Sequence, residues 1–251
     1  MFRGRSVSAG LAGIALAGAS CLPMTACGGH TAASLSAAPS ASASTAGPLA
    51  AMTGSQVETE AFANLKAASS VTLDGDLFMS GIFITLNLGI KPGHGCAGTI
   101  GYGSKGNLKL VLTGKVLYLN PNATFWKTIA GAEASAVIAR VEGRYVKTTT
   151  SAPGMSSIVR ICDLSQVMAS VTVSSAPSEG AVTTLNGIRV MPLEDPDNGE
   201  MYVTDTSKPE IVQMEVPGNG SGTGVLVFEV GAPVNLTPPP ASQVFEGSLA
   251  G

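Results

Sequence analysis

The sequence has 251 residues, of which only 12% are charged, and its formal net charge is -3 at neutral pH. No basic cluster matches a phosphate backbone, which argues against nucleic acid as a partner. Without the first 26 residues, which contain Arg3 and Arg5 as their only charges, the net charge would be -5. The rest of the chain is long enough for one domain with a sizeable core and a tail.

The first 26 residues have the pattern of a secretory signal peptide. Arg3 and Arg5 form a positive start, and residues 6–26 are uncharged and mostly small or apolar. Residues 24–29 (Met-Thr-Ala-Cys-Gly-Gly) place small side chains directly before Cys27, as the lipobox of a lipoprotein requires. We therefore expect cleavage before Cys27 and attachment of acyl chains such as palmitate to its thiol.

Two alternatives compete with this interpretation of the N-terminus. An uncleaved transmembrane helix is one, but Pro23 and the many Gly and Ala residues make a poor span. Cys21 is a second candidate for lipidation, but Gly18 stands where a lipobox has a larger apolar residue. Several acyl chains anchor a protein firmly. We expect the mature chain to be anchored by lipid to the extracytoplasmic face of the cell membrane.

The segment after Cys27 consists almost entirely of Ala, Ser, Thr, Gly and Pro up to residue 54. Such a composition does not bury enough apolar surface to order itself. The sequence therefore predicts a signal peptide over residues 1–26, a lipidated flexible tether over 27–54 and one folded domain over 55–247.

Two cysteines remain in the folded part, Cys96 and Cys162. In an oxidising compartment they should form a disulfide, which would stabilise the fold by about 4 kcal/mol on the chain-entropy model. The alternative is a pair of buried free thiols. A zinc site is disfavoured because His94 is the only histidine after the tether, and zinc takes about four ligands. We expect no metal and no cofactor.

The domain begins with a short amphipathic helix from Gln56, with Phe62 and Leu65 at helical spacing. Period-two alternation then predicts strands over 71–77, 82–90 and 108–112, and a strand over 115–120 follows the Thr113-Gly114 turn. The short turns between strands favour antiparallel pairing.

The middle of the chain changes to helical patterns. Asn120 and Pro121 are typical of a helix start, and two short helices are expected up to Arg140. An extended stretch follows over 142–147, and 156–170 again has helical spacing, which places Cys162 on a helix and Cys96 at a strand end.

The last third returns to strands over 183–193, 200–205, 210–216 and 224–230, separated by Asn-Gly and Pro-Gly turns. The sum is an α+β layout: a large antiparallel sheet with its helices inserted in mid-sequence.

In this order and spacing, several segments resemble the LolA-like lipoproteins of actinobacteria, which include the LppX/LprG-type lipid-binding lipoproteins of mycobacteria. The segments are residues 114–119, 125–127, 143–147, 185–188, 200–203 and 232–240. The resemblance implies a strongly curved antiparallel sheet, a half-barrel, with short helices covering its concave face. It also implies an apolar cavity between helices and sheet that holds acyl chains.

Two interpretations remain open for the apolar residues of these strands, which either fill an ordinary core or line that cavity. The residues concerned are Ile82, Ile84, Leu86, Leu88, Leu110, Leu112, Val212, Met214 and Val216.

Several motifs suggest other functions. Residues 101–106 match G-x-G-x-x-G, but a strand follows them instead of a helix, so we expect a turn. A Ser-His-Asp hydrolase would have to use His94, and the sequence has no G-x-S-x-G elbow. The carboxylates of Glu194, Asp195 and Asp197 fit a solvated turn better than a calcium loop, and Trp126 fits an anchor between helix and sheet.

The sequence therefore predicts a protein that is not an enzyme and that binds a lipid or another hydrophobic molecule, for carriage or presentation in the cell envelope. The alternative is an envelope sensor or regulatory module that uses the same scaffold to dock a protein, by analogy of fold alone.

Overall fold

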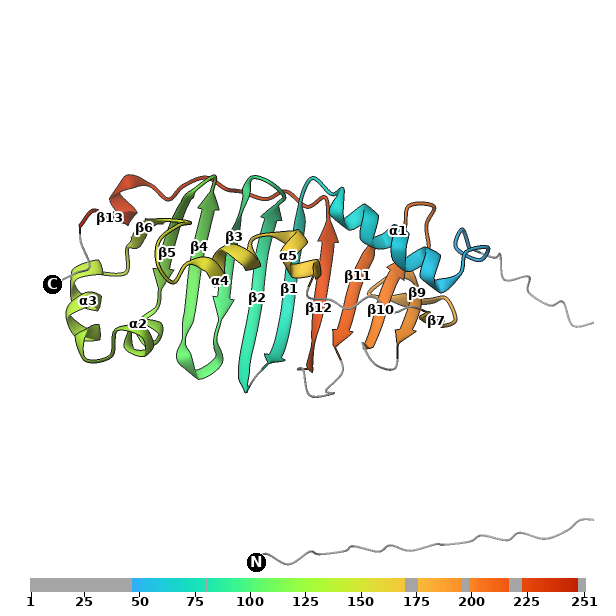
Figure 1. Cartoon of the computed structure of the whole chain (residues 1–251), viewed down its shortest axis with the longest axis horizontal. Coiled ribbons are helices and arrows are strands. Elements are labelled where there is room, and N and C mark those ends of the chain that lie inside the picture. The colour runs from blue at the N-terminus through green and yellow to red at the C-terminus, as the bar shows by residue number, and fades with distance from the viewer. Residues whose placement is uncertain (1–46, 80, 170–175, 196–198, 217–222, 248–251) are drawn as a thin grey trace, which may run out of the picture. The chain divides into compact units, whose positions relative to one another are not determined.

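One wide β-sheet with short helices against one of its faces forms the domain (Figure 1). A computed structural model provides the coordinates, and it describes residues 47–79, 81–169, 176–195, 199–216 and 223–247. Cys27, the expected signal peptide and the expected tether as far as residue 46 lie outside the described residues.

The helices are short. They are α1 (Gly54–Lys66), α2 (Ala123–Ala130), α3 (Ala134–Val141), α4 (Ser156–Ile161) and α5 (Leu164–Ala169), with 3-10 turns η1 (Gly103–Lys105), η2 (Gly131–Glu133) and η3 (Ala241–Gln243).

The strands are β1 (Val71–Met79), β2 (Ile82–Lys91), β3 (Gly95–Gly101), β4 (Asn107–Thr113), β5 (Val116–Pro121), β6 (Tyr145–Thr149), β7 (Ser178–Glu179), β8 (Thr183–Leu185), β9 (Ile188–Asp195), β10 (Gly199–Thr204), β11 (Ile211–Val216), β12 (Thr223–Val230) and β13 (Val244–Phe245). Their order in the sheet is β13-β6-β5-β4-β3-β2-β1-β12-β11-β10-β9-β7, and β8 also pairs with β9.

Two antiparallel meanders, β1 to β6 and β9 to β12, join where β1 pairs with β12 along their whole length. The described strands pair antiparallel except at one end, where β13 lies parallel to β6. The sheet is curved but does not close, because its outermost described strands are β13 and β7. The predicted fold class, a curved antiparallel half-barrel with short helices on one face, is confirmed.

We call the face on which α1, α4 and α5 lie the inner face (Figure 1). Alternate residues of the strands point to it and form the hydrophobic core, as the period-two pattern predicted. In β4, for example, Leu108, Leu110 and Leu112 are buried while Lys109 is exposed. The residues that α4 and α5 contribute to the same core are Ile158, Cys162, Leu164 and Met168.

Two glycines on the inner face suit the curvature of the sheet. Gly98 lies between Leu88 and Leu110 in the register of β2, β3 and β4, and its φ of 151° is one that side chains rarely adopt. A Cβ there would overlap the carbonyl oxygen of Asn87. Gly75 has a similar φ on β1. Glycine inside a strand allows such a bend at the expense of a packed side chain.

Helix α1 is fixed at its start by a capping box between Thr53 and Gln56. The chain before it also packs on the domain, since Leu49 belongs to the buried core. The amide of Leu49 donates to the buried carboxylate of Asp205 (3.4 Å), which also accepts from Nε of Arg189 (2.7 Å). The described end of the expected tether, residues 47–53, is thus held against the sheet.

Local details differ from the expectations. Cys96 was expected at the end of a strand, yet it lies near the start of a separate strand, β3, which was not predicted because its three glycines and short side chains weaken the alternation. The helix expected from Asn120 begins later, because Asn120 and Pro121 end β5 and the side chain of Asn122 caps α2. The helix expected over 156–170 is two helices, since α4 ends at Ile161 and Asp163 starts α5.

A β-bulge changes which residues of β11 face the core. Tyr202 pairs with Gln213 but the next residue, Val203, pairs with Ile211, so Val212 is left between the two pairs. Ile211 and Met214 consequently belong to the core cluster, whereas Val212 is buried outside it. Strict alternation through 212, 214 and 216 does not hold, because a bulge shifts the side-chain period by one residue.

Candidate functional site

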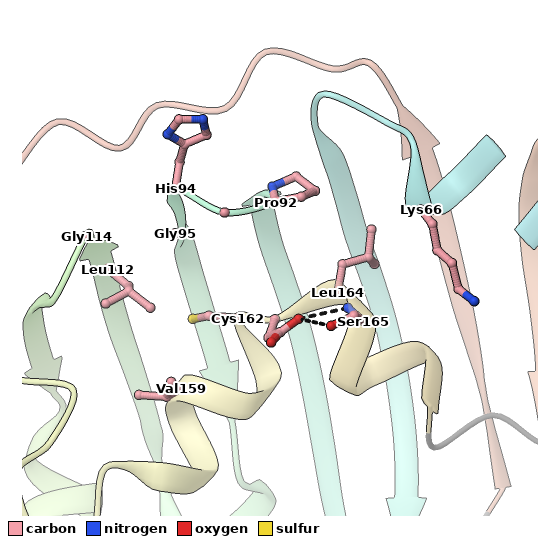
Figure 2. Close-up of a pocket in the computed structure, with 12 residues that line it drawn as sticks. Lys66, Pro92, His94, Gly95, Leu112, Gly114, Val159, Cys162, Leu164 and Ser165 are labelled. Atoms are coloured by element: carbon pink, nitrogen blue, oxygen red, sulfur yellow. Dashed lines mark hydrogen bonds between the residues drawn. The ribbon is translucent and has the colours of Figure 1, made fainter. Parts of the chain in front are cut away.

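A pocket of about 440 Å³ opens where the cover formed by α4 and α5 meets one edge of the sheet (Figure 2). We call this edge, which carries the β2–β3 and β4–β5 turns, the upper edge. The residues that line the pocket are Lys66, Pro92, Gly93, His94, Gly95, Leu112, Gly114, Val159, Cys162, Asp163, Leu164 and Ser165. Its volume lies within the range of roughly 300–1,000 Å³ that is common for small-molecule sites.

The floor of the pocket is apolar. Leu112 lies near the end of β4, Val159 is on α4 and Leu164 is the first residue of α5. Leu112 and Leu164 are also members of the buried core, so the pocket is the place where the core reaches the surface.

A disulfide between Cys96 and Cys162 ties the cover to the sheet. Cys96 lies on the inner face of β3, and Cys162 is the C-cap of α4, 66 residues further along the chain. The pairing is the one that the sequence predicted. Because Cys162 also lines the pocket, the bond fixes the position of the α4–α5 junction over the pocket floor.

The rim of the pocket is polar. Four exposed side chains form it: Lys66 at the end of α1, His94 in the β2–β3 turn, and Asp163 and Ser165 at the α4–α5 junction. Asp163 has a structural role, since its Oδ1 accepts from the amides of Ser165 (2.9 Å) and Gln166 (3.4 Å) and thereby caps α5. An apolar floor beneath a polar rim suits an amphiphilic molecule.

The nine residues predicted to line a cavity are only partly brought together. Leu86, Leu88, Leu110, Leu112 and Met214 are buried in one core cluster, and Ile84 packs against it. Leu112 is the one of the nine that lines the pocket described above. Ile82 and Val216 are half-buried near strand ends, and Val212 lies outside the core cluster.

Sequence reasoning missed most of the pocket, because its walls come from turns and from the break between two helices. The run Asp163-Leu164-Ser165 is the signal that could have located this break, since Asp is a preferred N-cap. No sequence pattern indicated a site at Lys66, Val159 or Ser165.

The motifs that suggested other functions have ordinary surroundings. Residues 101–106 form the turn between β3 and β4, as expected. Trp126 is buried at α2 beside the sheet. Glu194 and Asp195 end β9, and Asp197 lies outside the described residues. Within the part of the chain that the structure describes, no three His, Cys, Asp or Glu side chains gather as metal ligands would.

Two tyrosines have raised pKa values. Burial raises the pKa of Tyr102, whose ring lies 5.5 Å from the ring of Phe125. Burial, a hydrogen bond with Glu200 and the nearby charges of Glu215 and Glu194 raise the pKa of Tyr202 to about 12. Neither residue lines the pocket.

Comparison with known proteins supports the fold. LprF from Mycobacterium bovis matches with a TM-score of 0.50 and 14% identity, over 74% of this chain and 96% of LprF. This chain has the fold of LprF. The predicted resemblance to the LolA-like lipoproteins is thereby confirmed for the fold.

A weaker match is the lipoprotein LppX from Mycobacterium tuberculosis, with a TM-score of 0.43 and 11% identity over 73% of this chain and 98% of LppX. No protein-family model and no curated protein sequence matches the chain. Among the described helices, none combines the length and the apolar character needed to cross a membrane.

Proposed function

We propose that this chain is a non-enzymatic lipoprotein of the cell envelope, anchored through Cys27, that binds a lipid or another hydrophobic molecule in the pocket beneath α4 and α5. The observation that carries the proposal is the pocket itself, in which the buried core side chains Leu112 and Leu164 reach a solvent-open space of about 440 Å³. The apolar part of the ligand contacts this floor, and its polar part remains at the rim near Lys66 and His94.

Two further points support this proposal. The fold is that of LprF, and the resemblance noted in the sequence is to lipid-binding lipoproteins. In addition, the cover consists of two six-residue helices fixed by one disulfide, so it leaves an open edge beside the pocket.

A matched pair of variants tests the proposal. Val159→Trp places a large side chain on a residue that lines the pocket, and Arg160→Trp places the same side chain on the next, exposed residue of α4. The full chain is purified from membranes, its lipids are extracted and identified by mass spectrometry, and binding of a fluorescent long-chain fatty acid is measured. We expect Val159→Trp to lose the bound lipid and the probe, and Arg160→Trp to keep both.

The packed interior favours a second candidate, an envelope regulatory module that docks a protein. Side chains such as Leu88 and Leu110, which a large acyl cavity would leave exposed to it, are buried in the core cluster. A chain that repeatedly yields no extractable lipid, and whose Val159→Trp variant behaves as wild type toward the probe, would contradict the lipid-binding proposal and favour this module.

A further inference from the structure

The edge of the sheet opposite the pocket carries an unusual group of exposed apolar side chains. At the tip of the β1–β2 hairpin, Phe78 and Phe83 pair directly across the two strands, and they are 46% and 47% exposed. Ile129 on α2 is 57% exposed. We call the edge that carries this hairpin tip, η1 and α2 the lower edge (Figure 1).

The three elements of the lower edge are joined by contacts. Gly103 of η1 lies against Phe83, since a Cβ at Gly103 would be 3.4 Å from the Cβ of Phe83. The hydroxyl of Thr128 on α2 donates to the carbonyl of Lys105 at 3.2 Å. The hairpin tip, η1 and α2 are therefore neighbours along this edge, and we name their exposed side chains Phe78, Phe83, Ile129, Lys105 and Lys127 the lower-edge patch.

Apolar character at the hairpin tip is not limited to one face. No charged residue occurs from Leu77 to Ile84. Leu77 and Ile82 are half-buried on the inner side, while Phe78 and Phe83 are on the outer side. A tip that is apolar on both sides suits insertion into an apolar medium.

Basic and acidic residues are concentrated on different halves of the lower edge. Both lysines of the patch belong to the half that runs from β1 to α2. Acidic residues mark the other half, where Glu194, Glu200 and Glu215 lie side by side across β9, β10 and β11. Nearer to the patch, Asp76 accepts from Thr85 at 2.7 Å and Asp74 accepts from Asn87, and both carboxylates line a hollow of the outer face together with Phe78 and Phe83. The lysines of η1 and α2, which do not line this hollow, complement an anionic lipid surface, in which Phe side chains insert and lysines meet headgroups.

We infer that the lower-edge patch contacts the surface of a bilayer that contains anionic lipids. The chain length permits this contact: Gly47 follows Cys27 by twenty positions, which extended would span up to roughly 70 Å. The strands between the two edges are up to ten residues long, or roughly 33 Å. The inference does not require that the ligand in the pocket be a lipid.

Tryptophan variants in the full chain test the contact. The chain is incorporated into vesicles of phosphatidylcholine and phosphatidylglycerol whose acyl chains carry bromine, which quenches indole fluorescence inside the bilayer. Phe83→Trp reports on the patch. Ile188→Trp is the matched control, since Ile188 is 43% exposed at the start of β9, where β9 pairs with β8 away from the patch. Trp126 contributes the same background fluorescence in both variants.

We expect a blue-shifted, quenched emission for Phe83→Trp and neither effect for Ile188→Trp. Replacing Lys105 and Lys127 by Gln should weaken the contact by roughly fivefold per lysine at low salt, and high salt should abolish this difference. Should Phe83→Trp fail to fold, Phe78→Trp reports on the same site.

Equal quenching of the patch and control variants would overturn the inference. So would crosslinks from the patch to an envelope protein in cells combined with no quenching in pure vesicles, because the occupant would then be a protein. Lipid extraction tests the pocket separately, so failure of one proposal is distinguishable from failure of the other.

Discussion

Truncating the inner-face leucines should reveal whether the sheet encloses a filled core or a ligand cavity. Leu88 and Leu110 are 2% and 1% exposed, and Gly98 between them contributes no side chain. A void left by Leu88→Ala or Leu110→Ala therefore has no neighbour on β3 that could move into it. In filled cores, Leu→Ala substitutions lower the free energy of unfolding by about 3–5 kcal/mol, because lost burial and an empty cavity add together.

The assay is urea unfolding of the full chain, followed by circular dichroism, with Ile82→Ala as the control. Ile82 is half-buried near the hairpin tip, so its truncation should cost only about 1 kcal/mol. We expect the two leucine variants to lose about 3 kcal/mol or more, with no recovery when fatty acid is added. A loss of about 1 kcal/mol for Leu88→Ala, or a stability that added fatty acid restores, would refute the filled-core reasoning.

The remaining predictions concern the bend, the disulfide and the acidic strands. Gly98→Ala should lower the free energy of unfolding by more than about 1 kcal/mol, because its Cβ would overlap Asn87, whereas Gly101→Ala, with an ordinary φ and only Thr85 nearby, should be milder in the same urea assay. Replacing both Cys96 and Cys162 by Ala should lower it by about 4 kcal/mol on the chain-entropy model, and an unchanged unfolding midpoint would contradict a closed bond. Because the pKa of Tyr202 is raised from 10.0 to about 12, stability should fall as pH rises from about 10 to about 12, and Glu200→Gln should move the absorbance titration of Tyr202 toward lower pH.

Much of the fold follows from alternation that the sequence makes visible. The strands β1, β2, β4 and β5 have apolar residues at every second position, and burial of one face dictates their register. Strand β3 was not predicted, because glycines and small residues occupy most of the positions at which apolar side chains would have shown the alternation. The bulge at Val212 could not be read either, since its cause is the pairing with β10 and not a local residue type.

The candidate site was less predictable than the fold. The disulfide followed from counting cysteines, but the pocket depends on where the α4–α5 junction comes to rest over β4. That position is a tertiary property, because two six-residue helices are too short to be fixed by their own propensities.

The positions of the pocket and the lower-edge patch restrict how the two proposed functions combine. The pocket is lined by the β2–β3 and β4–β5 turns, while the patch is at the other ends of the same strands, roughly 33 Å away along β2. If the patch rests on the bilayer, the pocket opens away from it. If the chain is anchored through Cys27 as proposed, a bound lipid would then be presented away from the anchoring membrane, and its uptake from that membrane would require the domain to lift and turn. The effect of Lys105→Gln and Lys127→Gln on lipid loading distinguishes these modes: presentation predicts loading that is unchanged or lower, whereas uptake by turning predicts faster loading when the patch is weakened.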